Sequence, residues 1–275
     1  MPELPETETL ARDLAREVVG RTIVSATIRR PDVLREVTAR QFTGRTRGAR
    51  IERSWRRAKL VVLDLSTGHR IAVQPRFTGL LLLDGGDLDE RDRSYSTLDL
   101  LLDDGRRLHY SDVRRLGTVS LMSPERWQEY EGRLGVEPLD PEFTVEALSG
   151  FLRGSRQAVK KVIMNQYVVV GVGNIYANEA LWRAGVDPSR AADTVPRDAV
   201  ERLHRAIVDV LTEAIEARGT SFRDYRDASG EAGGFVVKLD AYGREGQPCR
   251  RCGRTLVGTH EVDGRATVLC VTCQR

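Results

Sequence analysis

The chain has 275 residues, of which 40% are hydrophobic and 30% are charged, and its formal net charge is +3. This composition excludes an intrinsically disordered chain, which would have too few apolar residues to form a core. No apolar run reaches the length of about 18 residues that a membrane-spanning helix needs. The N-terminal sequence MPELPETETL lacks the apolar segment of a secretory signal, so we expect a cytoplasmic protein.

The first half of the chain is predicted to be one helix followed by many short strands. Leu10 and Leu14 lie at helical spacing after acidic residues, which predicts a helix over residues 7–18. The short apolar runs that follow, many of them bounded by glycine, predict a sandwich or a barrel. Residues 84–94 are expected to form an exposed loop. The expected strands cover residues 22–28, 50–55, 60–65, 70–75, 78–83, 97–102, 107–110 and 117–122.

The second half of the chain is predicted to be mainly helical. A connecting segment with Pro138 and Pro141 leads into four helical patterns. Gly219 is expected to end the last of these helices as a C′ glycine, and a polar loop follows over residues 220–235. The tail from residue 236 again has the pattern of strands. The helical patterns are VEALSGFLR, AVKKVIMNQ, NIYANEALWRAG and DAVERLHRAIVDVLTEAIEAR.

Positive charge is concentrated in two segments of the chain. Residues 150–190 contain six basic and two acidic residues, and residues 244–275 contain six arginines and three acidic residues. Such segments indicate a polyanionic partner or, alternatively, an ordinary solvated face. Lysine is rare: it occurs only at Lys59, Lys160, Lys161 and Lys238. Because lysine can lose its proton and arginine does not, these four positions are candidates for chemistry.

The four cysteines have the spacing of a zinc site. Cys249 and Cys252 form one C-x2-C pair, and Cys270 and Cys273 form a second pair after 17 intervening residues. This spacing is typical of four thiolates that meet tetrahedrally around zinc, with a hairpin between the pairs. Cytoplasmic thiols stay reduced, which argues against disulfides. With four protein ligands the metal would have no open position, so the zinc is expected to be structural.

The N-terminus is a possible nucleophile. Removal of the initiator methionine would leave Pro2 with a free secondary amine, and an α-amino group titrates near pH 8. Attack of such an amine on a carbonyl-like carbon gives an iminium, as a lysine Schiff base does. The neighbouring carboxylates of Glu3 and Glu6 would be able to transfer protons. The plain alternative is the start of an ordinary helix, where proline and glutamate are common.

Five motifs, in order along nearly the whole chain, resemble those of the formamidopyrimidine-DNA glycosylase family, whose members excise oxidised bases and cut the strand. The resemblance implies an α+β fold with an N-terminal β-sandwich domain and its helix (1–132), a helix–two-turn–helix DNA-binding domain (133–235) and a zinc-finger hairpin (236–275). The motifs are PELPE at residues 2–6, RRAK at 56–59, YSDVRRLG at 110–117, GVGNIYA at 171–177 and GRAT at 264–267.

The resemblance also implies catalytic roles. Pro2 would attack C1′ of the damaged nucleotide and displace the base, and Glu3 would donate and accept protons around sugar opening. Lys59 would bind phosphate and act in β-elimination, and Arg265 would bind the phosphates that flank the lesion and assist δ-elimination. A base must be flipped out of the duplex before its sugar can be attacked, at a cost of roughly a few kcal/mol.

Further positions would contact damaged double-stranded DNA. Asn174 and the amides of the turn at residues 171–173 would grip a phosphate, a task that suits a helix N-terminus. Arg114 would fill the gap that the flipped base leaves, and phosphate contacts would make binding sensitive to salt. The DNA-contact positions that the resemblance implies are Glu6, Phe77, Tyr95, Arg114, Leu116, Arg156 and Asn174.

The chain departs from the family pattern at several of these positions. Phe77 stands where the family usually has Met, and Leu116 stands where it usually has Phe. Apolar wedges of either kind unstack bases, so we expect activity with altered discrimination of the opposite base. Gln74 and Tyr95 stand where the family commonly has His, which affects phosphate contacts rather than the chemistry. Without the resemblance, Phe77 would also fit a core position.

The substrate preference follows from the resemblance alone. Leu4, and the likeness of residues 219–235 to a loop that closes over a flipped purine, favour 8-oxoguanine and formamidopyrimidines. Two alternatives stay open: an endonuclease VIII-like glycosylase for oxidised pyrimidines, and a non-catalytic zinc-finger DNA-binding protein. The loop 219–235 is expected to be mobile without a lesion. We expect a nucleoid-associated monomer with one structural Zn²⁺ and no other cofactor.

Overall fold

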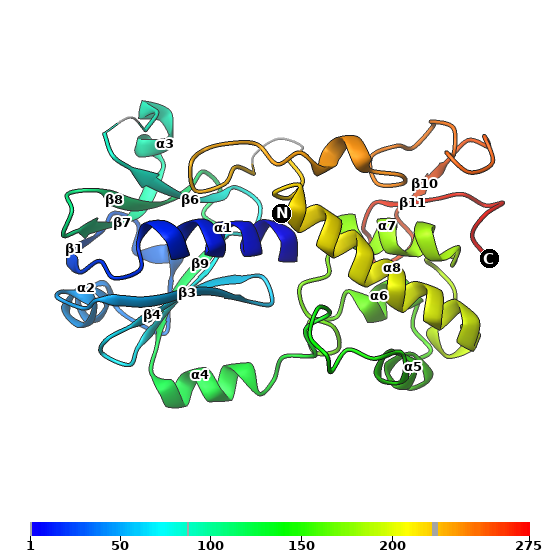
Figure 1. The fold of residues 1–275 in the computed structure, drawn as a ribbon, viewed down its shortest axis with the longest axis horizontal. Coiled ribbons are helices and arrows are strands. Elements are labelled where there is room, and N and C mark those ends of the chain that lie inside the picture. Colours follow the sequence, from blue (N-terminus) through cyan, green and yellow to red (C-terminus); the bar gives the residue numbers. More distant parts are fainter. Residues whose placement is uncertain (1, 87, 222–224) are drawn as a thin grey trace. The chain divides into compact units, whose positions relative to one another are not determined.

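The computed structural model describes residues 2–86, 88–221 and 225–275 (Figure 1). The chain forms two compact units: the first contains residues 1–132 and 217–234, and the second contains residues 133–216 and 235–275. These units are defined by packing, and the bounds of the three domains expected from the sequence remain a prediction. No helix within the described residues is long and apolar enough to cross a membrane.

The first unit begins with α1, Leu4–Glu17, which starts three residues earlier than the sequence predicts. Glu3 is the N-cap residue, and its backbone N–H donates to the Glu6 carboxylate at 2.8 Å. Pro5 in the first turn costs no hydrogen bond, because the first N–H groups of a helix have no partner within it. Leu10 and Leu14 are buried in the core of this unit, which fixes the orientation of the helix.

Two sheets form the body of the first unit, in the spatial orders β1-β7-β8-β6 and β2-β9-β5-β4-β3. All neighbouring strands are antiparallel except β2 and β9. The strands match the runs expected from the sequence, apart from the two-residue β2. Their bounds are β1 Ile23–Ile28, β2 Leu34–Arg35, β3 Ile51–Arg57, β4 Leu60–Leu65, β5 Arg70–Gln74, β6 Gly79–Asp84, β7 Ser96–Leu102, β8 Arg107–Asp112 and β9 Thr118–Met122.

The core of the first unit lies between the two sheets. In β4, Val61 and Leu63 belong to this core, whereas Leu60 and Val62 point to the other face of the sheet and pack around Trp127. Side chains alternate between the faces of a strand, so a strand with both faces covered is apolar throughout. This explains the continuous apolar run in β4. The β-sandwich expected for the N-terminal half is therefore confirmed.

Three helices of the first unit were not predicted from the sequence. They are α2 (Ala39–Thr46), α3 (Glu90–Ser94) and α4 (Pro124–Glu131). The expectation of an exposed loop over residues 84–94 was wrong for α3. Asp89 caps this helix by accepting from the Arg91 N–H at 2.8 Å, and Arg93 pairs with Asp84 at 3.1 Å. These local polar contacts leave no apolar periodicity to recognise.

Residues 217–234 return to the first unit after the long helix of the second. Tyr225 and Ala228 are buried in the core between the sheets. Arg218 donates to Asp13 at 2.7 Å, which anchors the start of this segment on α1. The expected mobility of residues 219–235 stays a prediction, and residues 222–224 of that loop lie outside the described residues.

The second unit contains four α-helices and a small hairpin. In α8, the buried side chains recur at every third or fourth position, as an amphipathic helix requires. Gly185 ends α7 with a φ of 71°, a conformation that glycine adopts without strain. The fold class α+β is confirmed. The elements are α5 Val145–Arg153, α6 Val159–Ile163, α7 Asn174–Ala184, α8 Arg197–Glu216, β10 Val257–Thr259 and β11 Thr267–Leu269.

Candidate functional site

The N-terminal end of α1 holds three of the predicted site residues in a buried position. Pro2 is buried, and Glu3 and Glu6 are only 2% and 1% exposed. One oxygen of the Glu6 carboxylate accepts from the Glu3 N–H, and the other accepts from the Thr220 N–H at 2.7 Å. Glu6 therefore joins the start of α1 to the segment 217–234. Its predicted contact with DNA stays a prediction.

Lys59 lies in the tight turn between β3 and β4. Arg57 pairs with Leu60, so Ala58 and Lys59 form the two-residue connection, and Ala58 has a φ of 53°. Lys59 is 8% exposed. Two-residue hairpin turns take such left-handed backbone angles because they match the twist of the strands. The turn fixes where the ammonium group is presented.

Arg56 connects this turn to α1. Its Nε donates to Glu8 at 2.9 Å, and its terminal nitrogen donates to the Ala58 carbonyl at 3.1 Å. The Arg56 side chain is 8% exposed, so the ion pair is shielded from water. The first helix and the Lys59 turn are thus held together by one guanidinium group. Sequence reasoning did not assign this role to Arg56, although it belongs to the RRAK motif.

A second group of predicted residues lies on two exposed loops of the first unit, 74–79 and 112–117, and at Tyr95 between α3 and β7. Phe77 is 47% exposed, Leu116 is 39% exposed and Tyr95 is 41% exposed. The guanidinium carbon of Arg114 lies 5.1 Å from the centre of the Phe77 ring, within the range of a cation–π contact. The structure therefore brings Phe77 and Arg114 together. Apolar side chains this exposed are typical of a contact surface.

Asp112 organises these two loops and is the residue that sequence reasoning missed. Its buried carboxylate accepts from the Thr78 hydroxyl at 2.5 Å and from the Gly117 N–H at 2.8 Å. It also accepts from the Arg114 N–H at 3.2 Å, and its own N–H donates to the Tyr95 carbonyl at 3.1 Å. The Asp112 carboxylate thus ties the loop that carries Phe77 to the loop that carries Arg114 and Leu116, and its backbone N–H adds the segment that carries Tyr95.

Two glycines let these loops approach each other closely. A Cβ on Gly117 would lie 2.7 Å from the Gln74 carbonyl oxygen and would overlap the Tyr110 hydroxyl. A Cβ on Gly79 would collide with the Pro75 carbonyl. Burial raises the pKa of the Tyr110 hydroxyl, which remains a neutral donor to Asp112 at 3.2 Å. The contact surface is therefore rigid at its base.

In the second unit, the GVGN turn at the start of α7 is held by Gln166. The Gln166 side chain accepts from the Gly171 N–H at 2.8 Å and donates to the Val172 carbonyl at 3.0 Å. Gly171 has a φ of 78°, and Gly173 is the N-cap residue of α7. The first amides of a helix have no partner within it, so this turn can bind an anion.

The loop that carries Arg265 is fixed on the start of α7. The Ala266 carbonyl accepts from Asn174 Nδ2 at 3.0 Å and from Lys160 Nζ at 3.1 Å, and Lys160 also donates to the Thr267 hydroxyl at 2.7 Å. Asn178 accepts from the Val268 N–H at 2.8 Å. The structure therefore brings Asn174 and the Arg265 loop together. Lys160 was noted in the sequence only as a rare lysine.

Arg265 and Arg156 are both exposed side chains of the second unit. Arg265 lies 3.3 Å from Asp263 and its side chain is 49% exposed. Arg156 lies in the connection between α5 and α6, and its side chain is 96% exposed, with Asp193 at 3.8 Å. Exposed ion pairs of this kind are weak, so both guanidinium groups can exchange these partners for a phosphate.

The four cysteines converge at the base of the β10–β11 hairpin. Their sulfur atoms all lie within 4.8 Å of one another. Tetrahedral zinc with bonds of about 2.3 Å places its sulfur ligands about 3.8 Å apart, so the group fits the metal. Burial raises the pKa of Cys249, but the N–H groups of Arg251 and Cys252 outweigh it and lower that pKa to about 6. Such a thiol is ready to bind as the thiolate.

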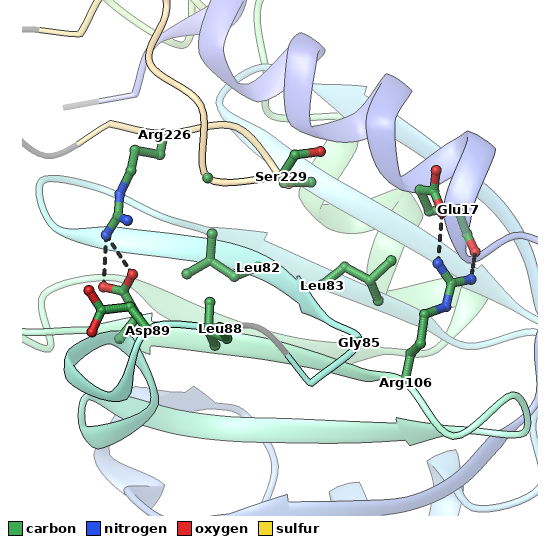
Figure 2. A pocket seen from close by; sticks show the side chains of 12 residues that line it. Glu17, Leu82, Leu83, Gly85, Leu88, Asp89, Arg106, Arg226 and Ser229 are labelled. Atoms are coloured by element: carbon green, nitrogen blue, oxygen red, sulfur yellow. Dashed lines mark hydrogen bonds and ion pairs between the residues drawn. The ribbon is translucent and has the colours of Figure 1, made fainter.

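A cavity of about 480 Å³ lies elsewhere in the first unit and contains none of the predicted site residues (Figure 2). Leu82, Leu83 and Leu88 form an apolar floor, as Figure 2 shows. Arg226, which pairs with Asp92 at 2.7 Å, lies at one side of the cavity. This ion pair anchors residues 225–230 on α3.

Comparisons with known proteins agree with this architecture. The model of the formamidopyrimidine-DNA glycosylase N-terminal domain matches residues 1–119, and that of the formamidopyrimidine-DNA glycosylase H2TH domain matches residues 134–226. The formamidopyrimidine-DNA glycosylase of Xanthomonas campestris pv. campestris is 43% identical over 276 residues, and that of Desulfitobacterium hafniense (strain Y51) is 38% identical over 276 residues. Both alignments cover 100% of this chain and 100% of the relative.

Solved structures give the same result. The MutM (Fpg) protein from Thermus thermophilus superposes with a TM-score of 0.87 and 35% identity, covering 99% of this chain and 98% of that chain. The wild-type Lactococcus lactis Fpg (MutM), solved in complex with a DNA containing N7-benzyl-Fapy-dG, superposes with a TM-score of 0.92 and 30% identity and full coverage of both chains, 100% and 100%.

These matches define a class, the DNA glycosylases of base excision repair. Within that class, the chain belongs to the formamidopyrimidine-DNA glycosylase family. The family expected from the five motifs is confirmed, and the main interpretation as a formamidopyrimidine-DNA glycosylase is supported over both alternatives. The roles of individual site residues, the strand-cutting activity and the bound zinc remain predictions.

Proposed function

We propose that the protein excises 8-oxoguanine and formamidopyrimidines from double-stranded DNA and then cuts the strand by β,δ-elimination. The observation that supports this most directly is the buried N-terminal end of α1, where Pro2 and Glu3 lie beside a carboxylate held by two backbone N–H groups. The relatives that match over their full length carry the name formamidopyrimidine-DNA glycosylase, which supports the glycosylase part of this proposal. One structural zinc, held by the four cysteines, would stabilise the hairpin that carries Arg265.

The chemistry begins at the Pro2 nitrogen once Met1 has been removed. The unprotonated amine attacks C1′ of the damaged nucleotide, the C1′–N bond to the base breaks, and the departing base takes up a proton. Glu3, next to the nucleophile, is placed to protonate the ring oxygen as the sugar opens. The product is an iminium between Pro2 and C1′, which acidifies the C2′ proton.

Strand cleavage follows from this iminium. Removal of a C2′ proton expels the 3′ phosphate, and a second elimination expels the 5′ phosphate. Lys59 and Arg265 supply the positive charge that stabilises these departing phosphates, since preorganised cations act most strongly where charge develops. Hydrolysis of the remaining imine regenerates the free amine. We expect the protein to work as a nucleoid-associated monomer.

Borohydride trapping tests this proposal. The zinc-loaded protein is mixed with a duplex carrying 8-oxoguanine opposite cytosine, and the reduced adduct is digested and mapped by mass spectrometry. We expect a covalent adduct at the Pro2 nitrogen. A Pro2→Glu variant, whose large second residue preserves Met1, should give none. The proposal is wrong if a protein with Met1 removed and zinc bound gives no adduct on this duplex.

A second variant separates base release from strand cleavage. Glu3→Gln keeps the shape of the side chain but removes the carboxylate. We expect it to lose excision of 8-oxoguanine by about 10²-fold, the scale of general acid–base catalysis. It should retain imine trapping on a duplex with a preformed abasic site. Equal loss on both duplexes would contradict a role of Glu3 specific to base release.

A further inference from the structure

A cavity of about 460 Å³ opens in the second unit at the C-terminal end of α7. Its walls come from the end of α7, the first turns of α8 and the two cysteine-containing segments. Half of its ten lining residues are arginines, and none of the ten has an acidic side chain. The arginines are Arg183, Arg190, Arg202, Arg251 and Arg275.

Three of these arginines have no carboxylate partner within the described part of the chain. Arg183 pairs with Glu213 at 2.7 Å, and Arg202 pairs with Asp198 at 2.6 Å. Arg190 instead donates to the hydroxyl and carbonyl oxygens of Thr194. Arg251 donates to two backbone carbonyls, and no ion pair or hydrogen bond of the Arg275 side chain is present among the described residues.

The cationic lining is held in place rather than free in solution. Arg251 lies over the Trp182 ring at 4.0 Å and donates to the Trp182 and Arg183 carbonyls at 2.7 Å each. Arg202 donates to the Ala184 carbonyl at 3.0 Å. Positive groups at these last carbonyls also stabilise the helix end. A guanidinium has five N–H donors, so each of these residues keeps donors for a ligand.

The zinc site next to the cavity accounts for part of this charge. Cys273 lines the cavity, and a zinc ion held by four thiolates would carry negative charge that Arg251 and Arg275, which line the same cavity, would help to balance. Arg190 and Arg202 belong instead to the helical part of the unit and have no such task. The zinc site therefore does not explain why all five groups line one cavity.

We propose that this cavity is a binding site for a phosphate-bearing anion. The planar donor forks of arginine match the oxygens of phosphate, which can be bound by two parallel hydrogen bonds. The cavity has the size of a small-ligand site, and four of its guanidinium groups are held by hydrogen bonds, which lowers the entropy cost of binding. Its ligand is either a free phosphate compound or a phosphate of a second DNA segment.

The site is distinct from the DNA contacts expected at the start of α7. Asn174 is the first residue of this helix and Gly185 follows its last. Eleven residues at about 1.5 Å each separate the two ends by roughly 16 Å. A second DNA segment bound here would lie at the other end of the helix from the GVGN turn.

The experiment uses the zinc-loaded full chain and two probes. Calorimetry measures the binding of inorganic pyrophosphate, which represents a free phosphate compound. In the DNA arm, the protein is first saturated with an unlabelled duplex that carries an abasic-site analogue, and a labelled undamaged duplex is then added. The Arg202→Gln/Arg275→Gln variant should bind the probe that occupies the cavity about tenfold more weakly or worse. Loss of one hydrogen bond to a charged group is enough for an effect of this size.

A matched control removes the same charge from outside the cavity. Arg205 and Arg254 are exposed and lie in α8 and in the cysteine-containing segment, but neither lines the cavity. Arg205→Gln/Arg254→Gln should leave binding of both probes unchanged. Trapping through Pro2 should be normal in both variants, so a failure of the proposed catalytic function would be seen separately.

The binding results of the two probes and the two variants decide between the possible ligands and test the proposal. Saturable binding of pyrophosphate that only the cavity variant weakens identifies a site for a free phosphate compound, whereas uptake of the labelled duplex with the same pattern identifies a second DNA segment. Equal weakening in both double variants would reduce the effect to net charge and overturn the proposal. No saturable binding of either probe would overturn it as well.

Discussion

Removing the acceptor at Asp112 should loosen the two exposed loops of the first unit. Its carboxylate accepts from Thr78, Arg114, Gly117 and Tyr110, and the side chain is 2% exposed. Asp112→Asn keeps one acceptor oxygen and replaces the other with a donor, so we expect the contacts of one oxygen to be lost. A hydrogen bond to a charged group is worth about 1.5–3 kcal/mol, and a buried donor left without a partner adds to the loss.

The expected destabilisation of the first unit is therefore about 2–4 kcal/mol, which corresponds to a fall in melting temperature of roughly 4–16 °C for a unit of this size. Thermal unfolding measures the overall loss of stability. Hydrogen exchange at the amides of Arg114 and Gly117 measures the local loosening of the loop. Exchange at these two amides should accelerate more than exchange in the strands. The discrimination between bases opposite the lesion should fall, because Arg114 and Phe77 lose their fixed positions.

Asp32→Asn is a matched control for this experiment. Asp32 pairs with Arg115 of the same loop at 2.9 Å, but both side chains are 50% exposed. An exposed pair contributes about 0–1 kcal/mol, so this variant should unfold close to the unchanged protein. If the two variants unfold at the same temperature and Gly117 exchanges at the same rate in both, the reasoning from buried acceptors is wrong.

Three further changes test other parts of the structure. Lys160→Met removes the ammonium group that holds the Ala266 carbonyl. Cleavage at a preformed abasic site should slow by about tenfold or more, because Arg265 loses its position. The zinc content, measured in parallel, should not change. Chelation of zinc should unfold the β10–β11 hairpin and weaken DNA binding, as circular dichroism and a salt titration would show; unchanged spectra would contradict a structural metal. Asp99 is buried, which raises its pKa, but hydrogen bonds from His109 and Ser96 and the charge of Arg29 lower it to about 2. This depressed pKa stabilises the protein above the unfolded value near pH 4, and the contribution is lost as the pH falls from about 4 to 2. Asp99→Asn should flatten acid unfolding in that window, and an identical acid midpoint would refute the assignment.

The strands were predictable because the pattern of apolar residues records their environment. Residues 60–63 of β4 and 80–83 of β6 are all apolar, and two covered faces explain this in β4, where Leu60 and Val62 pack around Trp127 of α4. In contrast, α3 is held by Asp89 and by the Arg93–Asp84 pair, and neither contact leaves a periodic signal. Short polar helices of this kind depend on partners that only the tertiary structure supplies.

In the candidate site, some features could be predicted from a motif and others depend on the tertiary structure. The cysteine spacing was sufficient to predict the cluster, since two C-x2-C pairs around a hairpin bring four sulfurs together. The part played by Asp112 was not predictable, although it lies within a recognised motif. Its partners Thr78 and Tyr95 are distant in sequence, and only the tertiary packing brings the Thr78 hydroxyl to its carboxylate and the Tyr95 carbonyl to its backbone N–H.

The distribution of lysine corrects one argument from the sequence. The chain has four lysines and otherwise uses arginine, and the sequence argument for a chemical role at these positions is that lysine can lose its proton. The structure divides them by burial instead: Lys59 and Lys160 are 8% and 1% exposed, whereas Lys161 and Lys238 are exposed. Lys160 donates to a carbonyl and a hydroxyl where a compact ammonium fits. A planar guanidinium with five donors would need more space and more acceptors. Geometry alone therefore suffices to retain Lys160, whereas the proposed mechanism uses the charge of Lys59 at the eliminated phosphate.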